Sequence, residues 1–157
     1  MIIIGVDPGK ITGIAMWQSP EARLTHNGAV AQNTQPWTVA EVGPTEVLSC
    51  IRGMLLGRRP RLIACERFIQ GTGRRPMSYQ GDAQHITGEV SALAQVLECP
   101  FVRQLPGPAK KIASNAVLKR IGAYTGTPDG HGDDACRQVI RALADNFPEV
   151  FADLIGI

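Results

Sequence analysis

The sequence predicts a single α/β domain over residues 1–157. Segments with strand and helix patterns alternate along the chain, and the apolar runs at 2–6 and 62–65 are continuous, as in strands buried on both faces. A length of 157 residues, with 44% hydrophobic and 19% charged side chains, is usual for one globular domain. Aromatic residues make up only 5% of the chain, so we expect aliphatic side chains to fill most of the core.

Five segments are predicted to be strands: 2–7, 11–17, 24–31, 61–66 and 100–104. Short turn-like connections join the first three, which are therefore expected to form an antiparallel meander. Residues 32–43 are mostly polar and contain Pro36 and Gly43, so they are predicted to form a loop.

Four segments carry apolar residues at helical spacing and are predicted helices: 44–57, 82–98, 109–121 and 133–146. Glycines and prolines mark the stretches 67–81 and 122–132 as loops. The apolar face of 82–98 is broad enough either to form a dimer interface or to be buried within the monomer. The tail, 147–157, carries large apolar residues and is expected to dock on the body or on a partner.

Targeting signals and metal-binding cysteine motifs are not evident in the sequence. No apolar run approaches the roughly 20 residues that span a bilayer, and the first residues do not resemble a signal peptide. The four cysteines form no CxxC pair, so they are expected to be buried thiols rather than zinc ligands. We therefore expect a protein of the reducing cytoplasm with no membrane association.

Two predicted strands end in a carboxylate. Asp7 closes the first strand before Pro8-Gly9, and Glu66 closes the strand 61–66. A lone buried carboxylate is costly unless a cation meets it, although Asp7 also suits the start of an Asx-type turn. If the two strands are parallel neighbours, both side chains reach one edge of the sheet, where open α/β sheets place their ligand sites.

The last predicted helix adds further acids. Asp133 and Asp134 lie in its first turn, where acids are common because they complement the helix dipole. Asp134 falls on the rim where this helix meets the sheet, and His131 lies one turn earlier. If these two residues meet Asp7 and Glu66, three carboxylates repel one another, and Mg²⁺ removes that penalty.

Basic residues cluster at loops and helix ends, although the net charge is only +2. Such clusters are either solvated surface or groups that bind a phosphate backbone. The basic side chains concerned are Arg58, Arg59, Arg61, Arg74, Arg75, Lys110, Lys111, Lys119 and Arg120.

Three motifs in order, Ile4–Ala15, Ala64–Phe68 and His131–Ala135, resemble the RuvC family of Holliday junction resolvases, which belong to the ribonuclease H-like superfamily. The resemblance spans nearly the whole chain. It implies a five-stranded mixed sheet flanked by helices, a homodimer, and hydrolysis of four-way DNA junctions in recombination and repair.

Three acids of this sequence, Asp7, Glu66 and Asp134, fall on the catalytic acids of that family. The resemblance implies two Mg²⁺ ions per active site, with Mn²⁺ as a substitute, and Asp7 as the ligand that bridges them. His131 falls where many members carry another Asp, which weakens the neutralisation of one metal ion. Asp133 could share or replace the role of Asp134.

The same resemblance suggests how the junction is held. Lys110, Lys111, Arg74 and Arg75 would bind its backbones. Two aromatic residues that border the 67–81 loop, Phe68 and Tyr79, could stack on an open base, with core packing as the alternative for Phe68. Assistance by a branch-migration motor is left open.

Three other functions compete with this interpretation. The first motif also resembles the phosphate loop of actin-like ATPases, but those enzymes need two such domains, and this chain is too short by about half. A resolvase-like nuclease acting on ribosomal RNA precursors shares the first motif and the size. A non-cleaving junction-binding protein could keep the fold, but the intact acids argue against it.

Overall fold

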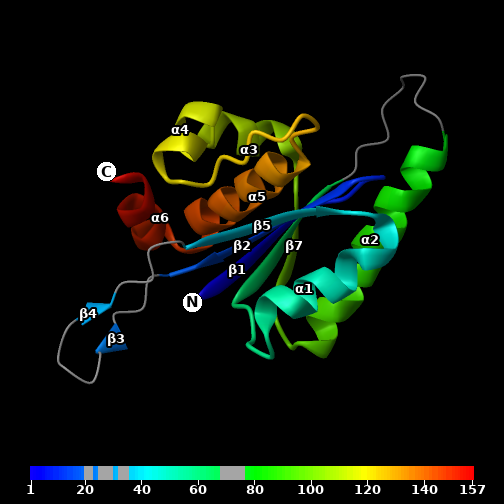
Figure 1. The fold of residues 1–157 in the computed structure, drawn as a ribbon, viewed down its shortest axis with the longest axis horizontal. Coiled ribbons are helices and arrows are strands. Elements are labelled where there is room, and N and C mark those ends of the chain that lie inside the picture. The colour runs from blue at the N-terminus through cyan, green and yellow to red at the C-terminus, as the bar shows by residue number, and fades with distance from the viewer. Residues whose placement is uncertain (20–22, 25–29, 32–35, 68–76) are drawn as a thin grey trace.

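The computed structural model describes residues 1–19, 36–67 and 81–157, and the backbone alone at 23–24, 30–31 and 77–80 (Figure 1). Five strands form one sheet in the order β5-β2-β1-β6-β7. Their bounds are β1 Ile2–Asp7, β2 Thr12–Gln18, β5 Trp37–Val42, β6 Leu62–Glu66 and β7 Phe101–Gln104. The predicted mixed sheet is confirmed: β1 is antiparallel to β2 and parallel to β6, and β6 is parallel to β7.

Helices cover both faces of this sheet (Figure 1). Their bounds are α1 Val47–Leu55, preceded by the 3₁₀ turn η1 Pro44–Glu46, then α2 Met77–Val96, α3 Pro106–Ile112, α4 Asn115–Arg120, α5 His131–Asn146 and α6 Pro148–Ile155. Helices α1 and α2 lie on one face, and α3 to α6 lie on the other (Figure 1). Among the described residues, no helix has the length and apolar character needed to cross a membrane.

The central strand β1 is buried along its whole length because both of its faces are covered. Ile3 packs in the core beneath α5, whereas Ile2 and Ile4 pack in the core beneath α1 and α2. This alternation explains why the sequence shows a continuous apolar run here rather than an apolar-polar pattern.

The third strand of the antiparallel meander is not the predicted segment 24–31. It is β5, which pairs with β2 and lies within the predicted loop 32–43. Residues Arg23–Leu24 (β3) and Val30–Ala31 (β4) instead form a separate two-stranded sheet. An edge strand needs only one well-buried side, and Trp37 and Val39 supply it by packing in the core beneath α5. The polar residues Thr38 and Glu41 are the reason why the sequence pattern predicts a loop here.

Two predicted helices have different bounds in the structure. Helix α2 begins at Met77 rather than at residue 82, and the predicted helix 109–121 is divided into α3 and α4. The division falls at Ser114, whose side-chain oxygen accepts a hydrogen bond from the Val117 N–H and caps α4.

The apolar face of α2 is used within the monomer. Ile86, Val90 and Ala94 are fully buried in the core between α2 and the sheet, so this face is not a dimer interface. The tail forms α6, and Phe151 and Leu154 pack against the core beneath α5, as expected for docking on the body. Two of the four cysteines, Cys65 and Cys136, are buried, and the other two are partly exposed.

Candidate active site

The pairing of β1 with β6 brings two acids to one edge of the sheet. Val6 is the partner of Cys65 in this parallel ladder, and Asp7 and Glu66 are the next residues in their strands. Both carboxylates therefore lie at the carboxyl ends of neighbouring parallel strands, as the sequence predicted.

Two glycines allow the beginning of α5 to lie directly on these strands. A Cβ atom at Gly13 would lie only 1.9 Å from the His131 carbonyl oxygen, and one at Gly5 only 2.2 Å from the Ala135 carbonyl oxygen. Any side chain at these positions would force the helix away from the sheet. The glycines of the first motif thus place His131 and Asp134 beside Asp7 and Glu66.

Asp7 is buried and forms an ion pair with His131. Its Oδ2 lies 2.7 Å from Nδ1 of His131, and the residue is only 7% exposed. Burial raises the pKa of Asp7, although the bond to His131 opposes the rise. The same hydrogen bond raises the pKa of His131, so each residue favours the charged form of the other.

Glu66 is held by a buried glutamine of α5. The Nε2 of Gln138, a residue 1% exposed, donates to Oε2 of Glu66 at 2.8 Å. Burial, followed by the charges of Asp7 and Asp134, raises the pKa of Glu66 to about 7. The charges of two acids from separate segments, Asp7 and Asp134, therefore act on Glu66.

Asp134 is paired with two basic residues. Its Oδ1 lies 2.5 Å from a guanidinium nitrogen of Arg137, and its Oδ2 lies 3.0 Å from Nζ of Lys110. Arg137 is itself buried, and it also donates to the Ala113 carbonyl oxygen at 3.0 Å and to the Asn115 side chain. Through Arg137, Asp134 is thus linked to the residues where α3 ends and α4 begins.

Asp133 has a different environment from Asp134, although the two are adjacent. Its Oδ1 accepts hydrogen bonds from the Thr125 N–H at 2.7 Å and from the Thr125 hydroxyl at 2.8 Å. Glu41 of β5 holds the same region, because its Oε1 accepts from the Gly132 N–H and from the Thr127 hydroxyl. Asp133 therefore fixes the loop before α5, through partners different from those of Asp134.

The acids are paired individually rather than gathered around one point. In the part of the chain that the structure describes, no three His, Cys, Asp or Glu side chains come close enough to hold a metal ion as they stand. The donor set nevertheless suits Mg²⁺, because Asp7, Glu66 and Asp134 supply oxygens at one edge and the charge of Asp134 raises the pKa of the other two.

The predicted DNA-binding residues are only partly described. Lys110 contacts Asp134, and Lys111 is exposed on the same helix. Phe68, Arg74 and Arg75 lie outside the described residues, as does the side chain of Tyr79, whose backbone belongs to α2.

Three residues of the site were not predicted from the sequence: Arg137, Gln138 and Glu41. Arg137 and Gln138 follow Asp134 by three and four positions, so they lie on the same side of α5 as the acid. Polar side chains on a helix face that otherwise packs in the core were the available signal. Glu41 carries no such signal, because the polar pattern of residues 32–43 predicts a loop.

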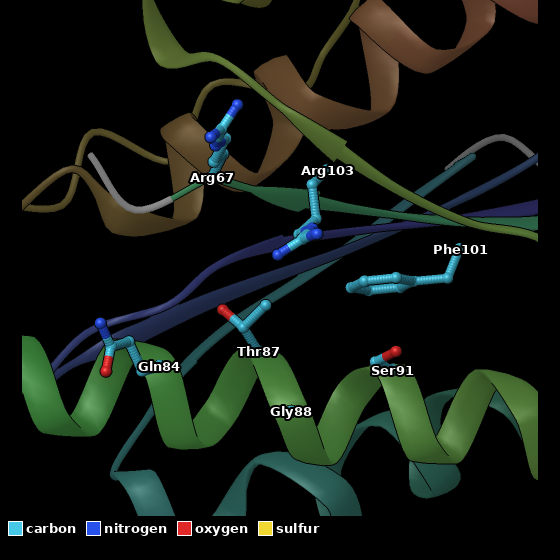
Figure 2. Close-up of a pocket in the computed structure, with 7 residues that line it drawn as sticks. All are labelled: Arg67, Gln84, Thr87, Gly88, Ser91, Phe101 and Arg103. Carbon is cyan, nitrogen blue, oxygen red and sulfur yellow. The ribbon is translucent and has the colours of Figure 1, made fainter. Parts of the chain in front are cut away.

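A cavity of about 700 Å³ lies between α2 and β7 (Figure 2). It is lined by Arg67, Gln84, Thr87, Gly88, Ser91, Phe101 and Arg103. The side chain of Arg103 extends from β7 toward Thr87 of α2 (Figure 2). The carboxylates of Asp7 and Glu66 instead bond to residues of α5, on the other face of the sheet.

Comparisons with known proteins support the fold. Neither family models nor curated protein sequences match this chain. Among solved structures, RuvC of T. thermophilus in complex with a Holliday junction substrate has a TM-score of 0.63 at 17% identity, over 92% of this chain and 96% of that one. A second Thermus thermophilus RuvC structure has a TM-score of 0.58 at 17% identity, over 99% of this chain and 97% of that one.

A viral protein has a similar structure as well. The Fowlpox virus resolvase, in complex with Holliday junction DNA, has a TM-score of 0.51 at 13% identity, over 91% of this chain and 99% of that one. With these likenesses, the predicted ribonuclease H-like fold of the RuvC type is confirmed.

Proposed function

We propose that this protein is a structure-selective endonuclease that cuts four-way DNA junctions by divalent-metal-dependent phosphodiester hydrolysis, in DNA recombination and repair. The observation that carries the proposal is the meeting of Asp7, Glu66 and Asp134, from two strands and a helix, at one edge of a RuvC-like fold. Burial, followed by the charges of Asp7 and Asp134, raises the pKa of Glu66 to about 7, a perturbation typical of a functional site.

The proposed ligands of the metal ions are Asp7, Glu66, Asp134 and His131. Carboxylate oxygens are the donors that Mg²⁺ prefers, and their mutual repulsion is relieved when a cation binds. When bound, two such ions would activate a water for in-line attack on phosphorus and stabilise the leaving oxygen, with Mn²⁺ as a substitute.

The protein's own side chains position these acids. The imidazole of His131 orients Asp7, and the amide of Gln138 orients Glu66. In this proposal Lys110, which contacts Asp134, and Lys111, which is exposed on the same helix, bind phosphates of the junction. Arg67 and Arg103 add two basic residues to the lining of the cavity beside α2.

A homodimer suits this substrate, because a four-way junction presents two equivalent strands and a two-fold dimer presents two equivalent sites. The apolar face of α2 is buried within the monomer, so the proposed dimer must use another surface.

Nicking of a synthetic four-way DNA junction in Mg²⁺ or Mn²⁺ tests the proposal. We expect Asp7→Asn to abolish nicking while junction binding persists, because the substitution removes a metal ligand and leaves the basic surface intact. Asp153→Asn, an exposed acid on α6, is the matched control and should nick like the wild type.

Three outcomes would contradict the proposal. Cleavage of structured RNA without cleavage of junction DNA would favour the ribosomal RNA nuclease. Junction binding without metal-dependent cleavage would favour a non-catalytic binding protein. Nicking that survives Asp7→Asn would mean that the acids at this edge are not the active site.

A further inference from the structure

The side chain of Lys110 reaches the acids from α3. Its Nζ lies 3.0 Å from Oδ2 of Asp134. Burial raises the pKa of Asp7 and of Glu66, and the charge of Lys110 opposes that rise at both residues. Lys110 is therefore the direct counterion of Asp134, and its charge also acts on Asp7 and Glu66.

The two oxygens of Asp134 are held in different ways. Oδ1 is bound by Arg137, whose side chain is 11% exposed and is also bonded to Ala113 and Asn115. Oδ2 is bound by Lys110, whose side chain is 55% exposed. A buried guanidinium with three partners is a fixed neighbour, whereas an exposed ammonium on a flexible stem exchanges partners readily.

Lys110 and a divalent cation compete for the same negative charge. A metal ion that binds Asp134 needs an oxygen free, and Oδ2 is the one whose partner can leave. The phosphates of DNA offer an exposed lysine an alternative partner. Binding of DNA can thus prepare the acids for the metal ion.

We propose that Lys110 is the exchangeable counterion of the acids: it neutralises Asp134 in the free protein and moves to a DNA phosphate when a junction binds, which frees Asp134 for the metal ion. This inference rests on the proposed function and adds that metal affinity depends on bound DNA. By linkage, metal ions then also strengthen the binding of DNA.

Calorimetric titration of the DNA-free full chain with Mn²⁺ tests the competition. Lys110→Met removes the charge and keeps most of the stem, and we expect it to bind Mn²⁺ about three- to fivefold more tightly than the wild type. Lys110→Arg keeps the charge and should match the wild type. Lys111→Met is the control on the same helix, since Lys111 forms no ion pair with a described residue, and its Mn²⁺ affinity should not change.

Binding of a four-way junction in EDTA supplies the second measurement. Both Lys110→Met and Lys111→Met should bind the junction more weakly. In each variant the slope of log K against log salt concentration should become about one unit less steep, because one phosphate contact is lost. Of these two variants, Lys110→Met alone is therefore expected to bind Mn²⁺ more tightly and the four-way junction more weakly.

The outcomes separate this inference from the proposed function. If the wild type binds Mn²⁺ and Asp134→Asn does not, but Lys110→Met binds it no more tightly than the wild type, the inference is overturned and the proposed function stands. A wild type that binds no Mn²⁺, with or without a four-way junction, overturns both. Thermal melting of each variant verifies that it is folded.

Discussion

The contact between Gly13 and the beginning of α5 provides a sharp test of how the site is built. In Gly13→Ala the new Cβ atom would lie 1.9 Å from the His131 carbonyl oxygen and 2.8 Å from the Gly132 nitrogen. Since a relaxed carbon–oxygen contact needs about 3.3 Å, the helix must move by roughly 1.4 Å. Both touching atoms belong to backbone, so no side-chain rotation can relieve the overlap.

The expected effects are large for so small a substitution. His131 lies 2.7 Å from Asp7, and Asp134 moves with the same helix. A displacement of about 1 Å at a catalytic group can reduce the rate about 100-fold. Overpacking of this kind costs about 2 kcal/mol, which lowers the Tm by about 4–8 °C in a domain of this size.

Two measurements on Gly13→Ala check this prediction: the Tm, and the nicking rate of a four-way junction in saturating Mg²⁺ well below that Tm. Gly53→Ala in α1 is the matched control, because nothing lies within 4 Å of its new Cβ atom. Alanine favours a helix over glycine by about 1 kcal/mol, so this variant should melt slightly higher and nick normally. A Gly13→Ala protein that melts lower but nicks as fast as the wild type would refute the reasoning.

Three further predictions concern the acids and their partners. The pKa of Glu66 is about 7 in the folded protein against 4.5 as its ordinary value, so the folded state binds this proton more tightly than the unfolded state does. The Tm in EDTA should therefore decrease as the pH rises from 4.5 to 7, and Glu66→Gln should make that decrease smaller. Asp133→Ala should lower the free energy of unfolding by about 2 kcal/mol and leave metal-dependent nicking in place, whereas Asp134→Asn should abolish nicking. Equal losses of nicking in the two variants would contradict the separate roles of the two acids. In urea unfolding, Arg137→Met should lower the free energy of unfolding by about 3 kcal/mol, because it leaves buried acceptors without a donor. Arg141→Gln removes an ion pair nearer the surface and should lower the same free energy by at most about 1 kcal/mol.

Sequence patterns were sufficient for the parts of the fold that depend on local chemistry. A continuous apolar run that ends in Asp7, and another that ends in Glu66, predicted two buried strands whose acids meet at one edge. The amphipathic pattern of the last helix placed Asp134 on its rim. Edge strand β5 was missed because half-buried strands carry polar residues, so their pattern resembles that of a loop.

The sequence by itself determined which residues form the buried strands and which acids end them, because these properties follow from the order of apolar and polar side chains. Tertiary structure alone decided the partner of each acid. Asp133 and Asp134 are neighbours with nearly the same local sequence, yet one binds Thr125 and the other binds Arg137 and Lys110. Such choices depend on the direction in which each side chain leaves its helix and on which distant segment packs there, and neither is encoded in local periodicity.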